Sequence, residues 1–400
     1  MTQTDIADLV ESGRLDLLDG DFYAGDPDPV YSYLRANRPV YFDATNELWG
    51  ISRYQDIVAI EKDARTWSNA GGYRPNIEAD ASIIGLDDPE HTDRRRLVAR
   101  RFTPRAVSIH EEHVQEIVTQ LLDAVAVKES VEAVADIAAP LPAQMIGRLL
   151  GFPENDWPQL VHWSATTIAL GGGPRYHNEE GIMAAIEFAE AALEVAETRR
   201  HEQADDLMSV WSAAEIGGCP LSNDNIASDA LLLLDGGAET TRTVIANGID
   251  TFIQNPDQQD LLRKEPHRIT AAVEELIRWT SPILNMCRVA TRDTEVAGVP
   301  IAKGQQVVLM YSSANRDESV FDHPERFDIT RMPNPHIAFG FGTHFCLGAS
   351  LARLELKIMF TDLLARFEDW TWADDIGPRR LPNAFVRGIT EFPINLRVVS

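Results

Sequence analysis

Residues 339–348 read FGFGTHFCLG and hold one of only three cysteines in a chain of 400 residues. A cysteine thiolate is a soft ligand for iron or zinc, and its reactivity depends on its surroundings. We expect a helix to begin at Cys346, where free N–H groups would stabilise an anionic sulfur. Gly340, Gly342 and Gly348 would let the backbone approach a large, flat group.

Cys346 by itself allows three interpretations. The common fate of a free cysteine is burial in the core, here within a glycine-rich turn. A zinc site needs four clustered ligands, whereas only His344 lies beside this cysteine and the chain has no CxxC spacing. A single thiolate suits haem iron, because the macrocycle itself supplies four nitrogens. Phe339 and Phe345 would then shield the sulfur from water.

A second segment, LLLLDGGAETTR at residues 231–242, falls in the middle of a long helical pattern. Gly236 and Gly237 each cost about 1 kcal/mol relative to alanine in a helix interior, so they would open the helical ladder or admit a ligand against the backbone. Glu239 and Thr240 follow, and a buried acid beside a hydroxyl can relay protons. The alternative is an exposed glutamate on a kinked helix, but the leucine run favours burial.

Glu275 and Arg278, in EELIRW, share one helix face at a spacing of three residues. Taken alone, this spacing indicates no more than a surface ion pair worth a few tenths of a kcal/mol.

Six arginines crowd into residues 94–105 of an otherwise acidic chain: Arg94, Arg95, Arg96, Arg100, Arg101 and Arg105. His91 and Arg95 lie four residues apart on one helix face and could hold an anionic group inside the protein. The other arginines could form a positive docking surface for an acidic partner. The alternative is an ordinary solvated basic face.

The overall composition narrows the class of protein. The net charge of −26 disfavours a nucleic-acid or anionic-membrane binder. No apolar run approaches the ~20 residues of a membrane span, and the acidic first residues do not resemble a signal peptide. The cysteines are odd in number and far apart, which favours a reducing compartment and hence the cytoplasm.

The elements that must position these residues are mostly helical. Helices are predicted over residues 29–37, 90–101, 105–125, 141–150, 156–170, 178–200, 222–252, 266–279 and 346–366, with Ser222 as the N-cap of the longest. PVYFD and LWGIS alternate as paired strands would, and residues 288–310 show β-type alternation with a hairpin-like AGVPIAKGQ. The chain is therefore expected to be mainly α, with a smaller β part formed by both ends.

These segments, in this order, resemble the cytochrome P450 superfamily of haem-thiolate monooxygenases. FGFGTHFCLG is similar to the haem-binding loop of that family, GGAETT to the oxygen-binding motif of its long central helix, and ELIR to its ExxR pair. PERF resembles the meander motif and DDPEHTDRRRLV the helix beside the haem. The resemblance implies a single cytochrome P450 domain over residues 1–400, with haem b between the long central helix and the cysteine-ligand helix.

The resemblance also implies a role for individual residues. Cys346 would be the axial ligand of the haem iron, and Glu239 and Thr240 the pair that delivers protons during oxygen activation. The residues implied around the haem are His91, Arg95, Gly236, Gly237, Arg288, Phe339, Gly340, His344 and Gly348, with His91, Arg95, Arg288 and His344 as partners of its propionates. Glu275 and Arg278 would form a buried ion network with Arg326, for which Arg331 is the second candidate.

The resemblance implies O2 and a hydrophobic substrate. The chain carries no flavin or nicotinamide domain, so a separate ferredoxin-type donor fed by a reductase is expected. The residues expected to line the substrate pocket are Ile168, Leu233, Ala238, Ile283, Leu284, Met286, Phe385 and Val386. WSNAGGYRP, NMCRVATRDTE and GGAETTR are similar to segments of actinobacterial members that oxidise steroids or cholesterol-type side chains, while fatty acids, branched lipids and terpenoids are alternatives. A peroxide-driven enzyme and a non-catalytic haem sensor are the rival functions, and the Glu239–Thr240 pair argues against both.

Overall fold

The β-rich part of the molecule is a five-stranded sheet that combines both ends of the chain. We describe residues 2–399 of a computed structural model. The strand order is β1 (Val40–Asp43), β2 (Leu48–Ile51), β10 (Gln306–Met310), β7 (Asn285–Ala290) and β3 (Trp67–Ser68). β10 runs parallel to β2, and the other neighbours are antiparallel. The predicted pairing of PVYFD with LWGIS is confirmed.

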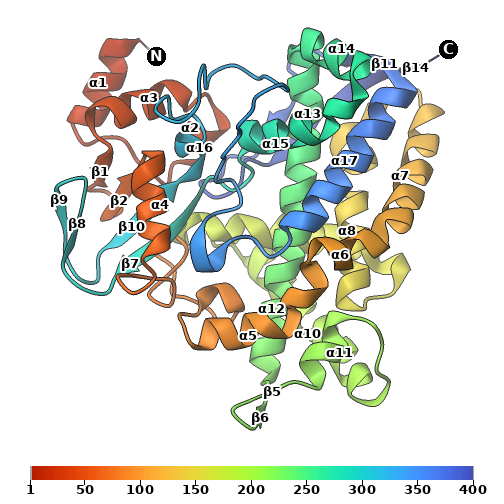
Figure 1. The fold of residues 1–400 in the computed structure, drawn as a ribbon, viewed down its shortest axis with the longest axis horizontal. Coiled ribbons are helices and arrows are strands. Elements are labelled where there is room, and N and C mark those ends of the chain that lie inside the picture. Colours follow the sequence, from red (N-terminus) through yellow and green to blue (C-terminus); the bar gives the residue numbers. More distant parts are fainter. Residues whose placement is uncertain (1, 400) are drawn as a thin grey trace.

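Short helices accompany this sheet: α1 (Gln3–Glu11), α2 (Gly20–Ala24), α3 (Asp28–Asn37), α4 (Tyr54–Lys62) and α16 (Tyr311–Ala314). Figure 1 shows them with the sheet on one side of the molecule, beside the larger helical part.

The helical part contains most of the chain. Its helices are α5 (Glu90–Ala99), α6 (Pro104–Val107), α7 (Glu111–Ala126), α8 (Pro140–Leu150), α9 (Trp157–Thr167), α10 (Glu179–His201), α11 (Leu207–Ser212), α12 (Asn223–Leu234), α13 (Thr240–Gln254), α14 (Pro256–Lys264), α15 (Ile269–Thr280) and α17 (Ala349–Arg366). The small sheets are β11 (Phe367–Trp372) with β14 (Pro393–Val398) and β4 (Val131–Glu132), β12 (Arg379–Arg380) with β13 (Ile389–Glu391), β5 (Glu215–Ile216) with β6 (Cys219–Pro220), and β8 (Thr294–Val296) with β9 (Val299–Ile301).

The long central helix is interrupted where the two glycines were expected to disturb it. Ser222 caps α12 by accepting the N–H of Asn225, and the helix then passes through a π-helical turn over Asp235–Glu239 before continuing as α13. A π turn frees backbone groups from the regular ladder and often marks a functional site. In Figure 1 the combined helix crosses the middle of the molecule with α17 beside it.

The cysteine segment departs from the prediction at its helix boundary. α17 begins at Ala349, with Gly348 as its N-cap, so Cys346 lies in the preceding loop and not in the helix. Gly340 and Gly342 both have positive φ, at 69° and 72°, and a Cβ on Gly342 would lie 2.3 Å from the carbonyl oxygen of Glu61. Glycine is therefore required for this loop to pack against α4.

The fold is mainly helical with small sheets, as predicted. One large apolar core joins α7, α8, α10, α13, α15 and α17, and smaller clusters lie under the five-stranded sheet. No helix within residues 2–399 is long and apolar enough to cross a membrane. The assignment of residues 1–400 to a single domain stays a prediction.

Candidate functional site

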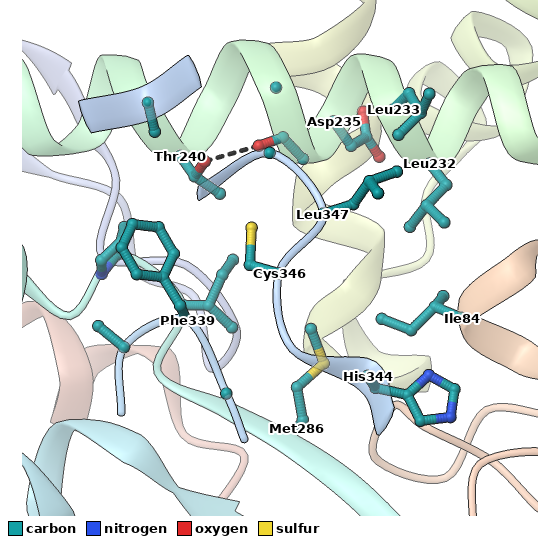
Figure 2. A pocket seen from close by; sticks show the side chains of 18 of the residues that line it. Ile84, Leu232, Leu233, Asp235, Thr240, Met286, Phe339, His344, Cys346 and Leu347 are labelled. Carbon is teal, nitrogen blue, oxygen red and sulfur yellow. Dashed lines mark hydrogen bonds between the residues drawn. The ribbon is translucent and has the colours of Figure 1, made fainter. Parts of the chain in front are cut away.

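A cavity of about 230 Å³ lies between the central helix and the cysteine loop. The π turn, Thr240 and the start of α13 line one side, and Phe339, Cys346 and the first turns of α17 line another. Figure 2 shows the sulfur of Cys346 directed toward the helix that bears Thr240. The two motifs singled out in the sequence thus share one cavity.

The surroundings of Cys346 act in opposite directions on its thiol, and burial has the larger effect. Burial raises the pKa of the Cys346 thiol, while a hydrogen bond from the backbone of Gly348 and the charge of Arg95 lower it. The backbone N–H of Ala349 acts in the same direction as that of Gly348. Although Cys346 precedes the helix, the N–H groups at the helix N-terminus lie close enough to its sulfur to stabilise an anion, as predicted.

The two phenylalanines beside Cys346 differ in exposure. Phe339 is half-buried and lines the cavity, with the Arg353 guanidinium 4.6 Å from its ring centroid. Phe345 packs against Phe339 with ring centroids 6.1 Å apart, but it remains 40% exposed. Phe339 therefore faces the cavity, whereas Phe345 lies partly at the protein surface.

Four predicted partners of an anionic group converge on the cavity: His91, Arg95, Arg288 and His344. The rings of His91 and His344 lie with centroids 4.0 Å apart. Arg95 donates hydrogen bonds to the carbonyl oxygens of Thr343, at 3.2 Å, and of Phe345. Burial, followed by the charge of neighbouring groups that include Arg288, lowers the pKa of His344 to about 2. This end of the cavity is therefore rich in cationic groups and N–H donors.

These residues fit the haem that the family resemblance implies. His91 is 1% exposed, and neither of its ring nitrogens has a hydrogen-bond partner among the described residues. A Cβ on Gly236 would meet no atom within 4 Å, so the helix leaves space on its cavity side. Unsatisfied donors beside two arginines, an open helix face and a single thiolate suit a flat group that carries carboxylates. All ten residues predicted to surround the cofactor, from His91 to Gly348, line the cavity.

Glu61 is a site residue that the sequence analysis missed. It is 5% exposed, pairs with Arg288 at 3.1 Å, and accepts a hydrogen bond of 2.6 Å from the hydroxyl of Tyr311. Burial raises its pKa, against the lowering effect of Arg288. Nothing in the short pattern around Glu61 indicates this role, because its partners lie more than 200 residues away in the chain.

Thr240 and Glu239 occupy different sides of the central helix. The hydroxyl of Thr240 lines the cavity and donates to the carbonyl oxygen of Gly236 at 2.6 Å. Glu239 is 2% exposed, does not line the cavity, and pairs with Arg242 at 2.8 Å. Burial raises the pKa of Glu239, with Arg242 opposing the shift. The expected burial of the acid is confirmed, and its role in proton delivery stays a prediction.

The ion network of Glu275 and Arg278 is buried, and Arg331 rather than Arg326 completes it. Glu275 and Arg278 are each 0% exposed and lie 2.7 Å apart. The Nε of Arg331 lies 3.2 Å from both carboxylate oxygens of Glu275. Arg326 contributes only its backbone carbonyl, which accepts from Arg278 and Arg331, while its side chain is exposed. The prediction of Arg326 is therefore wrong, because the turn points its side chain outward.

The arginine cluster divides differently from the prediction. Arg94, assigned to a docking surface, is 5% exposed and forms an ion pair of 2.5 Å with Asp229 of α12. Its guanidinium fixes α5 to the central helix, so it is a structural residue. Arg96, Arg100 and Arg105 are exposed, and these three residues define what we call the basic patch.

Five of the eight predicted pocket residues line the cavity: Ile168, Leu233, Ile283, Met286 and Phe385. The other three are buried without lining it: Ala238, Leu284 and Val386. Val386 packs against Ile168 and Phe385. Ala238 faces the main helical core, and Leu284 faces the core beneath the sheet. Successive residues along a helix or strand point to different faces, and the assignment of these three to the substrate pocket stays a prediction.

The cavity also holds ionisable residues that the pocket prediction omitted: Arg74, Asp235 and Glu355. Burial raises the pKa of Glu355 to about 8, and a hydrogen bond with Thr241 opposes the shift. Asp235 was visible in the sequence as the one acid within LLLLDGGA, and a carboxylate among leucines is a signal of burial.

Comparison with known proteins identifies relatives along almost the whole chain. The sequence model of the family described as Cytochrome P450 matches residues 177–391. The chain is 39% identical over 394 residues to "Steroid C26-monooxygenase" of Mycobacterium tuberculosis, covering 96% of this chain and 98% of that protein.

Among solved structures, a cytochrome P450 of Mycobacterium marinum in complex with pseudoionone superposes with a TM-score of 0.88 at 32% identity, covering 94% of this chain and 97% of that one. A Bacillus megaterium protein in complex with testosterone gives a TM-score of 0.86 at 30% identity, with 94% and 98% covered.

Proposed function

This chain belongs to the cytochrome P450 family and is a haem-dependent monooxygenase, and from that premise we propose that it hydroxylates a steroid or sterol-derived molecule with electrons from a ferredoxin. The observation that carries the catalytic part of this proposal is the cavity in which Cys346 faces the helix bearing Thr240. When bound, the haem would supply the activation of O2, which an electron-rich thiolate ligand promotes.

We assign the residues of the cavity to distinct tasks. Cys346 would hold the haem iron, and the N–H groups of Gly348 and Ala349 would stabilise its sulfur. His91 and Arg95 would bind the propionates, for which the ring of His91 has an N–H donor without a partner among the described residues. The hydroxyl of Thr240 would give its proton at the cavity. Buried Glu239, after leaving Arg242 and taking a proton from water, would return a proton to Thr240.

Two observations support a steroid. The Mycobacterium tuberculosis relative is a steroid C26-monooxygenase, and a structural neighbour was solved with testosterone. The cavity walls include Ile168, Leu233, Ile283 and Phe385, and such apolar walls suit a large hydrophobic molecule. A terpenoid is the second candidate, because the Mycobacterium marinum neighbour was solved with pseudoionone.

The basic patch supports an acidic electron donor. Arg96, Arg100 and Arg105 are exposed on a chain whose net charge is −26, so they form a local positive region for an acidic ferredoxin-type protein. A cytoplasmic location belongs to the same proposal, because Cys219, Cys287 and Cys346 are all free.

A spectral binding screen tests the substrate class. Steroids, fatty acids and terpenes are titrated into the haem-loaded protein, and the low-to-high-spin shift of the Soret band is recorded. A shift with steroids at micromolar concentration is the expected result. A response to terpenes alone would replace the steroid proposal with the terpenoid one. Separately, Cys346→Ser should abolish the red-shifted Soret band of the ferrous carbon-monoxide complex, and its persistence would remove Cys346 as the ligand.

A further inference from the structure

Asp235 is a buried carboxyl group at the cavity that the proposed reaction does not use. It lies in the π turn of the central helix, is 8% exposed, and lines the cavity. Figure 2 shows it on the same helix as Thr240, beside Leu232 and Leu233. Its Oδ1 accepts a hydrogen bond of 2.7 Å from the hydroxyl of Thr167, while Oδ2 has no hydrogen-bond partner among the described residues. One oxygen of this group therefore remains available to a ligand.

The partner of Asp235 indicates which oxygen of its carboxyl group would carry a proton. Thr167 is 4% exposed, and its hydroxyl lies 2.7 Å from the carbonyl oxygen of Trp163 as well as 2.7 Å from Asp235. A hydroxyl has a single proton to donate. When that proton goes to Oδ1 of Asp235, a protonated carboxyl group carries its own proton on Oδ2, the oxygen without a partner. Burial raises the pKa of Asp235 to about 7, which agrees with a protonated carboxyl group near neutral pH.

Arg74 brings an unpaired cation to the same cavity. Its Nη1 is buried without a hydrogen-bond partner among the described residues, although its guanidinium lies 3.7 Å from the ring centroid of Phe385. A Cβ at Gly171 would lie 2.5 Å from this Nη1, so a glycine there makes room for the guanidinium. The backbone is fixed as well, because Gln306 donates to the carbonyl oxygen of Arg74 at 2.9 Å.

The two groups are near neighbours without being an ion pair. The charge of Arg74 lowers the pKa of Asp235, but no salt bridge joins them within residues 2–399. A buried N–H donor without an acceptor, such as Nη1 of Arg74, costs free energy, and a protein retains such a group where a ligand satisfies it. Both groups offer donors toward the cavity, so the matching ligand atom is an acceptor.

We propose that Arg74 and Asp235 form a polar anchor that selects substrates carrying a hydrogen-bond-accepting oxygen, either a ketone on a steroid or a carboxylate on a fatty chain. The inference rests on the proposed function in so far as the anchored molecule is the substrate of the monooxygenase. The anchor adds specificity to an otherwise apolar cavity, because a site with buried donors rejects analogues that lack the acceptor.

Matched pairs of probes test the anchor by equilibrium dialysis against the haem-loaded protein. Cholest-4-en-3-one is compared with cholest-4-ene, and palmitic acid with hexadecane, so each pair differs by its oxygen function. The wild-type protein should prefer the oxygenated member of one pair by about tenfold or more, since charge-assisted hydrogen bonds to buried groups are strong. The pair that shows the preference tells whether the anchor binds a ketone or a carboxylate.

Arg74→Leu and Asp235→Leu should each reduce that preference about tenfold or abolish it. Asp235→Asn keeps a donor and should retain most of it. Arg65→Leu is the matched control, because Arg65 is exposed and outside the cavity. The ferrous carbon-monoxide spectrum reports folding, and Arg74→Gln replaces the leucine variant if that variant does not fold.

Two results would overturn the anchor: no preference in either pair for the wild-type protein, or a preference that survives both leucine variants. Product formation is measured separately with a surrogate ferredoxin. If the preference depends on Arg74 but no oxygenated product forms, the anchor is supported and the proposed function is refuted. If product forms but the protein shows no preference, the proposed function is supported and the anchor is refuted.

Discussion

Arg331 should stabilise the fold through Glu275, and Arg326 should not. Arg331 is 8% exposed in its side chain, and its Nε lies 3.2 Å from each oxygen of a fully buried carboxylate. Its two terminal nitrogens donate to three backbone carbonyls, of Asp322, His323 and Arg326. Replacing Arg331 with alanine would remove all these bonds at once, whereas the exposed side chain of Arg326 takes part in none of them.

The expected magnitude follows from what remains around Glu275. Breaking a buried ion pair costs about 3–5 kcal/mol, because a charge is left without compensation. Arg278 continues to hold Glu275 with bonds of 2.7 and 2.8 Å, so the lower end applies. We expect Arg331→Ala to lower the free energy of unfolding by about 3 kcal/mol, and Arg326→Ala to change it by less than about 0.5 kcal/mol.

Urea unfolding followed by tryptophan fluorescence measures this difference, and the ferrous carbon-monoxide spectrum before unfolding confirms that both variants hold haem. Arg331→Lys is an informative third variant, since lysine keeps the charge but lacks the planar fork that reaches both the carboxylate and the carbonyls. It should fall between the wild-type protein and Arg331→Ala. Equal losses for Arg326→Ala and Arg331→Ala, or a larger loss for Arg326→Ala, would refute the assignment of Arg331 to the network.

Three further predictions concern the cavity and its surroundings. Thr240→Ala should lower the product formed per reduced nicotinamide consumed by about tenfold or more, since a positioned proton donor contributes about 10²–10⁴-fold; unchanged coupling would count against Thr240. Arg96→Glu with Arg100→Glu should slow reduction by a surrogate ferredoxin and flatten its dependence on salt, and identical donor kinetics would locate the docking surface elsewhere. Glu355→Gln should flatten the pH dependence of stability. The pKa of Glu355 is raised to about 8 in the fold from an ordinary 4.5, so its contribution is complete below about pH 4.5 and is lost as pH rises through 8; urea midpoints of both proteins between pH 5 and 9 measure this, and parallel curves would contradict it.

The cavity shows which kinds of inference the sequence permits. Gly236 and Gly237 predicted a disturbed helix because glycine weakens the helical ladder wherever it stands, and the π turn is found there. The start of the helix after Cys346 was harder to predict. α17 begins three residues after Cys346, because the N-cap and not the residue pattern decides where a helix starts. Arg94 was misassigned because its partner Asp229 is 135 residues away and leaves no local pattern.

The sequence by itself determined the family, the mainly helical architecture, and the ten predicted residues that line the cavity, since these depend on short motifs whose spacing is local. The tertiary structure alone decided which charges pair. It selected Arg331 over Arg326, buried Arg94 against Asp229, and brought Arg74 to the cavity that contains Asp235. Pairing between distant residues depends on how whole elements pack and on which side chains lose water. No local spacing encodes that choice.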